Sequence, residues 1–502
     1  MLSRSKKLLL NTSTSVIYQV VSVVCGLIVP KMFIEYYGSA VNGLVSSIAQ
    51  FLSFITLLEL GVGAVVQSAL YKPLAQKNKT EISKIIVSSE KFFKRIAYIF
   101  AVYIAGLVIF YPMTVKDQYD WGFTAVLILV ISISTFAQYY FGITYQMLLN
   151  ADQCAYIQFI VQTVMLILNA VATVVMAVIG ADVIVLKFIT SLIFLLRPVI
   201  FTAYAKKHYD IDKKIKFTDE PIKQKWNGLA QHLASVVLNS TDVVVLTLFS
   251  TLENVSIYQV YHSIVNGIKL LVTTFTNSVQ ATIGDMIARE EHETLDNFFS
   301  HFEWLIHTIV TLLFTCVGIL ILPFIQIYTA NVTDVNYYLP AFAVLTTLGT
   351  ACYCLRLPYN IVVLAAGHYK QTQASAIIEA IINIVISVVF VIKFGIIGVA
   401  IGKPVAMLYR TIYFVFYLKK NIMSRKVRYF FLHCVTDIVT VLISVFATSF
   451  ITLSEVTFVA WIFMAVKVGL ICVAVTLVVN LIFYFKQVKS LINKVLRKKE
   501  ST

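Results

Sequence analysis

The sequence predicts an all-α polytopic membrane protein with about 14 transmembrane helices, built as two parallel six-helix repeats plus two extra C-terminal helices. Three observations lead to this fold class: the composition, a series of long apolar segments, and the distribution of basic residues between them. Of the 502 residues, 59% are hydrophobic and only 13% are charged. Soluble domains carry about 25% charged residues, and disordered chains need low hydrophobicity. Both classes are therefore excluded.

The apolar segments fix the number of predicted helices. A membrane span needs about 20 mostly apolar residues, and fourteen segments meet this requirement, separated by short polar gaps that leave no room for a folded extramembrane domain. The predicted spans are 9–34, 41–69, 92–113, 121–149, 154–179, 182–205, 227–250, 255–287, 303–329, 337–363, 371–393, 396–418, 430–452 and 456–485.

Basic residues in the gaps predict the orientation. With the N-terminus placed inside, the inner gaps hold 30 Lys and Arg residues, whereas the outer gaps hold two, Lys116 and Lys393. Because Lys and Arg keep short loops in the cytoplasm, we expect a multi-pass protein of the cell membrane with both termini cytoplasmic. The same pattern accounts for the net charge of +15, and no nucleic acid partner is expected.

An internal repeat relates the first six predicted helices to the next six. Similar residues recur at offsets of 213 to 215, and the offset spans an even number of helices, so the two copies should share one orientation, as in parallel-repeat transporters. The matched pairs are Tyr145 and Tyr359, Asn169 and Asn383, Gly180 and Gly395, and Arg197 and Arg410. We therefore expect an N-terminal lobe (1–205), a basic cytoplasmic linker (206–226), a C-terminal lobe (227–420), and two additional helices with a basic tail (421–502).

Polar residues recur at helical spacing inside several predicted spans. The eighth span carries His262, Asn266, Lys269, Thr273, Thr276 and Gln280 on one face, and the first, fifth, seventh and eleventh spans carry similar rows. Isolated Ser, Thr and Asn side chains often bond neighbouring helices to each other. Whole polar faces on five helices instead favour a water-filled central cavity, because polar groups are costly in hydrocarbon.

Charged residues within the spans indicate what this cavity binds. Eight cations lie outside the counted gaps, namely Lys31, Lys187, Arg197, Lys269, Arg356, Lys403, Arg410 and Lys467, although those near helix ends can extend to the headgroups. The acidic candidates are Glu59, Asp242 and Glu379, which either neutralise neighbouring cations or bind H⁺ or Na⁺ for coupling. An excess of cations favours an anionic ligand, and phosphate fits best. The predicted substrate-binding residues are Lys269, Arg410, Lys403, Arg356, Arg197, Asn266 and His262.

Signatures of catalysis are absent from the sequence. It has no phosphate-binding glycine loop, no GxSxG and no HExxH motif. The seven cysteines are scattered along apolar segments without metal-binding or redox spacing, and we expect them to be small buried hydrophobic residues. No enzyme activity, catalytic residue, metal or cofactor is therefore predicted.

Two segments resemble the multidrug/oligosaccharidyl-lipid/polysaccharide exporter superfamily, in particular its bacterial polysaccharide transporter branch of Wzx-type flippases. These are EYYGSAVNGLVSSIAQFLSFITLLELGVGAVV (35–66) and STDVVVLTLFSTLENVSIYQV (240–260). The resemblance implies two six-helix bundles that rock between inward-open and outward-open states. It also implies a cationic cavity for a lipid-linked, diphosphate-bearing oligosaccharide, with the polyprenyl tail left in the bilayer.

Several functions fit these features. The leading hypothesis is a flippase for a polyprenyl-diphosphate-linked oligosaccharide, with membrane lipids and polysaccharide polymerase machinery as further partners. An ion-coupled drug antiporter of the same fold is the first alternative, although a cationic cavity disfavours it. A polytopic polysaccharide polymerase or ligase would need a large outer loop, and the outer gaps are short. A non-transport scaffold leaves the polar faces unexplained.

Overall fold

The computed structural model describes residues 4–59, 62–215, 229–423, 425–485, 487 and 489, and these residues form helices and no strands. The predicted all-α class is confirmed. The chain divides into two compact units, residues 1–260 and 261–502. The lobe, linker and tail boundaries given above stay a prediction, and residues 216–226 of the predicted linker fall outside the described residues.

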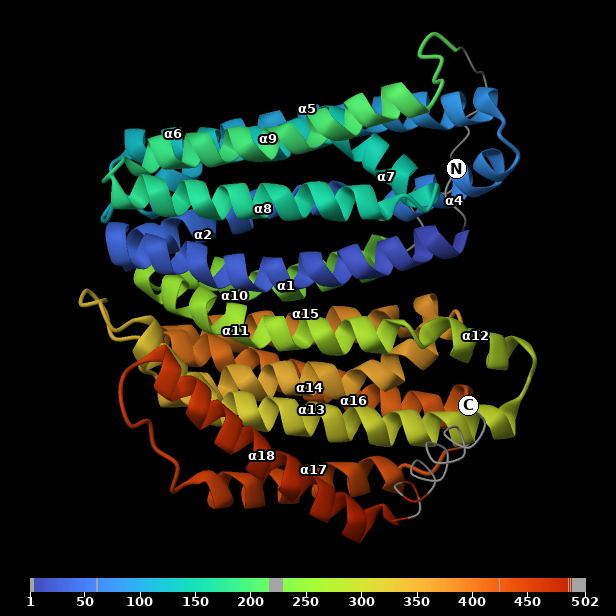
Figure 1. Ribbon diagram of the computed structural model, residues 1–502, viewed down its shortest axis with the longest axis vertical. Coiled ribbons are helices and arrows are strands. Elements are labelled where there is room, and N and C mark those ends of the chain that lie inside the picture. Colours follow the sequence, from blue (N-terminus) through green and yellow to red (C-terminus); the bar gives the residue numbers. More distant parts are fainter. Residues whose placement is uncertain are drawn as a thin grey trace. The chain divides into compact units, whose positions relative to one another are not determined.

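Unit 1 contains the helices of the first six predicted spans and the seventh. In chain order these are α1 (Arg4–Tyr37), α2 (Ser39–Ser53), α3 (Thr56–Glu59), α4 (Val62–Ala75), α5 (Lys79–Thr114), α6 (Trp121–Ala137), the π-helix η1 (Gln138–Gly142), α7 (Ile143–Ala151), α8 (Ala155–Val178), α9 (Val183–His208) and α10 (Leu229–Phe249). In Figure 1, α8 and α9 run side by side along this unit.

Unit 2 contains most of α11 and all later helices. These are α11 (Leu252–Asn277), α12 (Gln280–Ala288), α13 (His292–Tyr328), α14 (Pro340–Ala365), α15 (Tyr369–Phe394), α16 (Ile396–Asn421), α17 (Arg428–Thr448) and α18 (Phe458–Phe483). Each of the fourteen predicted spans therefore corresponds to a helix or to a group of consecutive helices among the described residues. Helices α5 and α13 begin about three turns before the predicted spans because polar, charged turns precede their apolar parts.

Eleven helices of the described residues are long and apolar enough to cross a membrane. The three remaining predicted spans, 41–69, 227–250 and 255–287, correspond to α2–α4, α10 and α11–α12, which are shorter or more polar. Large apolar side chains lie exposed on the long helices, including Val102 at 75%, Ile392 at 74% and Phe446 at 72%. Such a surface requires lipid around it, and the chain is a multi-pass membrane protein.

Two of the predicted continuous spans are broken. Residues Phe54 and Ile55 separate α2 from α3 in short turns of the 3₁₀ type. In the eighth span, Ser278 and Val279 separate α11 from α12, where the Ser278 hydroxyl donates to the Phe275 carbonyl at 2.6 Å. Side chains that bond to the backbone compete with helical hydrogen bonds, which explains breaks that an apolar pattern does not reveal.

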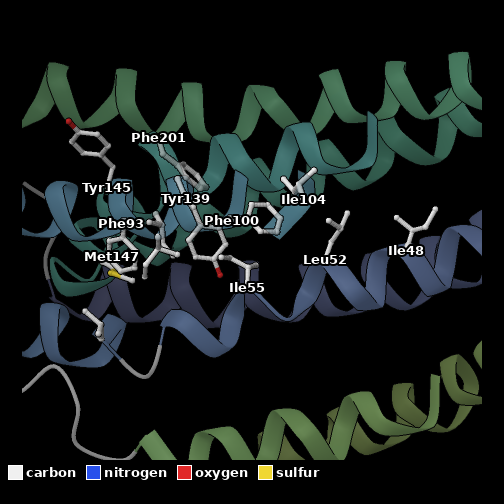
Figure 2. Packing of buried hydrophobic residues seen from close by; sticks show 14 of the residues in the cluster. Ile48, Leu52, Ile55, Phe93, Phe100, Ile104, Tyr139, Tyr145, Met147 and Phe201 are labelled. Atoms are coloured by element: carbon white, nitrogen blue, oxygen red, sulfur yellow. The ribbon is translucent and has the colours of Figure 1, made fainter. Parts of the chain in front are cut away.

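The core of unit 1 packs α2 against α5 and the helices that follow. Figure 2 shows Leu52 of α2 and Ile55, which follows this helix, facing Phe100 and Ile104 of α5. Phe100 is fully buried. Side-chain oxygens cap several of the helices that surround this core, and Asp182, for example, accepts from the Ile184 amide at 2.7 Å at the start of α9.

The internal repeat is visible in the backbone of each unit. Most residues with positive φ fall in pairs at the predicted offset: Lys77 and Glu290, Gln153 and Gly367, and Gly180 and Gly395. Each pair lies at the end of corresponding helices, where a left-handed residue ends the helix. The two copies thus share connections as well as helices.

Candidate functional site

A buried carboxylate joins two arginines at the centre of unit 2. Glu379 on α15 forms ion pairs with Arg356 on α14 and with Arg410 on α16, the latter with a distance of 2.6 Å between Nη1 and Oε2. The Glu379 side chain is 1% exposed and the two guanidinium groups are 6% and 9% exposed. Three helices of this lobe therefore meet at one charged cluster.

Two lysines surround this cluster and give it excess positive charge. The Lys269 ammonium on α11 lies 4.4 Å from the centre of the Tyr353 ring, and Arg356 lies 5.0 Å from the same ring. Lys403 on α16 is within electrostatic range of Lys269 and of His262. Counting these four cations and Glu379 alone gives a formal charge of +3.

The arginines of the cluster also retain hydrogen-bonding capacity. Among the described residues, the buried Nε atoms of Arg356 and Arg410 have no hydrogen-bond partner. Because both guanidinium groups bind the same carboxylate, one acceptor cannot satisfy all of their donors. Glu379 alone therefore does not satisfy the hydrogen-bond donors of the two arginines.

Small residues allow these helices to approach closely. A Cβ atom on Gly402 would lie 2.5 Å from the Ser387 hydroxyl and 2.9 Å from the Asn383 carbonyl of α15, and a Cβ atom on Gly398 would lie 2.2 Å from the Phe390 carbonyl. Gly398 and Gly402 form a GxxxG pair, the spacing that brings transmembrane helices into backbone contact. This contact places Glu379 of α15 within reach of Arg410.

Unit 1 contains a separate polar cavity of about 410 Å³. Two residues predicted from the sequence, Arg197 of α9 and Glu59 of α3, line it. The other polar side chains on its lining are carboxamides and one phenol, from Gln67, Gln138, Tyr139, Gln146 and Asn150. The volume lies in the range of about 300–1,000 Å³ that is usual for ligand pockets.

Irregular backbone shapes this cavity. The π-helix η1 places Gln138 and Tyr139 on its wall, and π-turns inside α-helices are frequent at functional sites. A Cβ atom on Gly142 would lie 2.4 Å from Pro198, so glycine permits η1 to contact α9 next to Arg197. The guanidinium of Arg197 donates to Gln146 at 3.3 Å, and its buried Nε has no partner among the described residues.

The three predicted coupling carboxylates have different surroundings. Glu59 accepts a hydrogen bond from Tyr139 at 3.2 Å in the unit 1 cavity. Asp242 of α10 is 2% exposed and accepts from Tyr258 at 2.7 Å. Glu379 is paired with two arginines. The position of Glu379 favours charge neutralisation over ion binding for this residue, because both of its oxygens already accept from guanidinium groups.

Other predicted polar residues have mixed roles. His262 is half-buried, and Asn266 lies exposed on α11. Asn11 of α1 accepts from the Tyr156 amide at 2.7 Å, and Gln158 of α8 donates to the Gln146 carbonyl at 2.6 Å. The side chains of Asn11 and Gln158 thus form hydrogen bonds between neighbouring segments. This is the helix-bonding role that the sequence left open beside the lining of a cavity. All seven cysteines are free, and five of them are buried.

A repeated group of three residues, in which a glutamate contacts a tyrosine and a basic residue, was not predicted from the sequence. In unit 1, Tyr145 donates to Glu90 at 2.5 Å, and Lys213 pairs with Glu90 at 3.1 Å. Partial burial lowers the pKa of Lys213, but its hydrogen bonds with Tyr145 and Glu90 raise that pKa overall.

In unit 2, Tyr359 donates to Glu303 at 2.6 Å, and Arg425 pairs with Glu303. The three corresponding positions differ by 214, 213 and 212 residues. This recurrence of tyrosine, glutamate and a basic residue can be found in the sequence. However, both glutamates lie at or beyond the edges of the predicted spans, where charged residues are common.

Comparison with known proteins identifies the fold. No protein-family profile and no curated protein sequence matches the chain. Among solved structures, the chain is similar to the lipid II flippase MurJ in an inward closed conformation, with a TM-score of 0.70, 17% identity, and 96% of this chain and 100% of that chain covered.

A multidrug resistance MATE transporter of the MOP superfamily, in an inward-facing conformation, gives a TM-score of 0.62 with 14% identity over 80% of this chain and 96% of that chain. A MOP superfamily transporter from Pyrococcus furiosus gives a TM-score of 0.52 with 13% identity over 83% of this chain and 94% of that chain. The protein therefore has the fold of the exporter superfamily that its sequence resembles.

Proposed function

We propose that the protein is a flippase that moves a polyprenyl-diphosphate-linked oligosaccharide across the cytoplasmic membrane by alternating access, for cell-surface polysaccharide biosynthesis. The observation that carries this proposal is the charge of +3 formed by Lys269, Arg356, Lys403 and Arg410 around Glu379. A positive site inside a membrane protein is costly. A diphosphate with about two negative charges would neutralise most of it, and arginine and lysine are the usual phosphate-binding residues.

The unit 1 cavity supports the sugar portion of this substrate. Its carboxamide groups both donate and accept hydrogen bonds, as sugar hydroxyl groups do. Among the described residues, Arg197 is the only cation on the cavity lining and Glu59 the only carboxylate, so their formal charges cancel. A neutral, amide-rich cavity suits an oligosaccharide better than a diphosphate, and we assign the two ligand portions accordingly.

The test is flipping of a fluorescent polyprenyl-diphosphate-linked disaccharide in liposomes that contain the purified protein. Lys269→Ala should slow flipping by roughly tenfold to a hundredfold. This range corresponds to the loss of one charge-assisted contact worth about 1.5–3 kcal/mol. Lys269→Arg should be better tolerated. Lys467→Ala is the matched control, because Lys467 is an exposed lysine on α18 outside the cluster.

Arg410→Ala should also weaken transport, and it must be checked for folding because it removes one partner of Glu379. Normal polysaccharide in a deletion strain that carries either alanine variant at native expression would refute the diphosphate site. Gln67→Leu separates the two ligand portions: it should slow the disaccharide-bearing lipid and leave bare polyprenyl diphosphate unaffected. Equal slowing of both lipids would refute the assignment of the unit 1 cavity to sugar.

An ion-coupled antiporter of cationic drugs is the second candidate, since MATE transporters share the fold. The arrangement around Glu379 disfavours it, because a cationic drug would meet net positive charge in unit 2. Transport of a cationic dye by the same liposomes, unaffected by Lys269→Ala, would favour this alternative. A polymerase or ligase would instead lengthen or transfer the lipid-linked sugar, which product analysis of the same liposomes detects.

A further inference from the structure

A stacked pair of histidines lies beside the Glu303 ion pair of unit 2. His307 on α13 and His433 on α17 have ring centroids 4.8 Å apart and an interplanar angle of 25°. Their side chains are 2% and 5% exposed. They line a small cavity between α13, α17 and α18 that has room for about one water molecule.

The contacts of His307 define its charge. Its Nδ1 lies 2.6 Å from Asp437 Oδ2, and its Nε2 lies 3.4 Å from the Tyr359 hydroxyl oxygen. The single hydroxyl proton of Tyr359 is donated to Glu303 at 2.6 Å. Both ring nitrogens of His307 therefore face acceptors, and only a doubly protonated imidazolium can donate to both.

His433 is satisfied without a charge. Its Nε2 lies 3.4 Å from Glu303 Oε2, and its Nδ1 lies 2.6 Å from the hydroxyl of Tyr484. The Tyr484 hydroxyl also lies 3.3 Å from Thr436 Oγ1, but its contact with His433 is the shorter one. With the hydroxyl proton in that shorter contact, a neutral imidazole donates from Nε2 to Glu303 and accepts at Nδ1 from Tyr484. A second positive charge in the adjacent ring would repel the first.

The charges of the whole cluster balance with one bound proton. The titratable and charged groups that face the histidine pair are Glu303 of α13, Tyr359 of α14, Asp437 and Cys434 of α17, Arg425 before α17 and Tyr484 after α18. Arg425 also contacts the more exposed Asp296 at 3.3 Å. Glu303 and Asp437 carry two negative charges and Arg425 one positive charge, so a protonated His307 brings the buried group to zero.

We propose that the His307–His433 pair is a proton-binding site, which holds one exchangeable proton and thereby attaches α17 to α13 and α14. Loss of this proton leaves Asp437 and Glu303 with a single cation in a buried site, which is costly. The His307–Asp437 contact then loses its charge, and α17 is held to α13 less strongly. The site belongs to the additional helices and is distinct from Lys269, Arg356 and Arg410.

Unit 1 supplies an internal comparison. Its equivalent group, Glu90, Tyr145 and Lys213, forms no hydrogen bond or ion pair with a histidine among the described residues and balances as one carboxylate and one ammonium group. The proton site is therefore an addition to one copy of a repeated group.

The experiment is nitrogen NMR of the full-length protein in nanodiscs, labelled with ¹⁵N-histidine and titrated from pH 5 to pH 10 without any transport substrate. One histidine should show both nitrogens protonated at neutral pH and lose a single proton on alkalinisation, and His307→Gln should remove this signal. His301→Gln is the matched control on the same helix. Within the described part of the chain, the hydrogen-bond partner of His301 is the Asn297 carbonyl one turn earlier, which is not an ionisable group. A neutral His307 at pH 7 would overturn the proposal.

A stability measurement tests the attachment of α17. The native protein and His301→Gln should lose thermal stability as the pH rises through deprotonation, because the folded state holds the proton more tightly than the unfolded state. His307→Gln should lack this loss. An identical alkaline loss in His307→Gln would show that another group is responsible. Neither measurement involves a lipid-linked sugar, so failure here is distinguishable from failure of the proposed flippase function.

Discussion

Replacing Glu379 by glutamine removes the negative charge that Arg356 and Arg410 share. The formal charge of the unit 2 cluster rises from +3 to +4, while the shape of the side chain is nearly unchanged. Removing one partner of a buried ion pair costs about 3–5 kcal/mol, because the remaining charges stay buried without compensation. The glutamine oxygen still accepts one hydrogen bond worth about 1 kcal/mol. We therefore expect Glu379→Gln to lower the free energy of unfolding by about 3 kcal/mol.

Steric trapping in bicelles measures this free energy at equilibrium in a bilayer-like medium. Glu455→Gln is the matched control, because Glu455 lies exposed between α17 and α18 and its replacement should change stability by less than about 0.5 kcal/mol. A loss below about 1 kcal/mol for Glu379→Gln would refute the neutralising role of this carboxylate. Glu379 would then return to consideration as an ion-binding residue.

Three further predictions concern topology, packing and energy. Cysteine labelling from outside the cell should miss a cysteine placed at Lys213 and reach one placed at Asp334; the opposite pattern would reverse the orientation. Gly402→Val should lower the free energy of unfolding by about 1–3 kcal/mol through overpacking, whereas Gly469→Ala, which meets no atom within 4 Å, should not. Outward movement of two negative charges from an electrically negative interior is downhill by roughly 4–5 kcal/mol per 100 mV. Flipping in liposomes should therefore follow an imposed potential and survive Asp242→Asn, a substitution that lies outside the unit 2 cluster; dependence on a proton or sodium gradient alone would contradict this.

The sequence predicts those parts of the structure that follow from apolar length and from the distribution of charge. Apolar length and basic gaps predict helices, and the fourteen spans correspond to helices or consecutive helices of the described residues. The same reasoning cannot locate breaks such as Ser278–Val279 or the π-turn at Gln138, because these depend on side-chain contacts with the backbone and on neighbouring helices. An apolar pattern contains neither.

The candidate site was predicted in part. Lys269, Lys403, Arg356 and Arg410 stand out because cations are rare in spans, and the structure brings them together in unit 2. The sequence does not show that Glu379 is the carboxylate that pairs with Arg356 and Arg410. That pairing depends on how the helices pack, including the close approach of α15 and α16 at Gly402. The sequence does not single out the buried Glu303, because it lies at the edge of its predicted span, where charged residues are usually solvated.

The two groups of Tyr, Glu and a basic residue bear on the ancestry of the chain. Three residues and the two contacts that join them recur at nearly constant spacing, and independent origin of the same group in each half would require several coincident substitutions. The recurrence is therefore best explained by duplication of a segment that already contained this group. Among the described residues, the histidine pair of α13 and α17 contacts the group in unit 2 only.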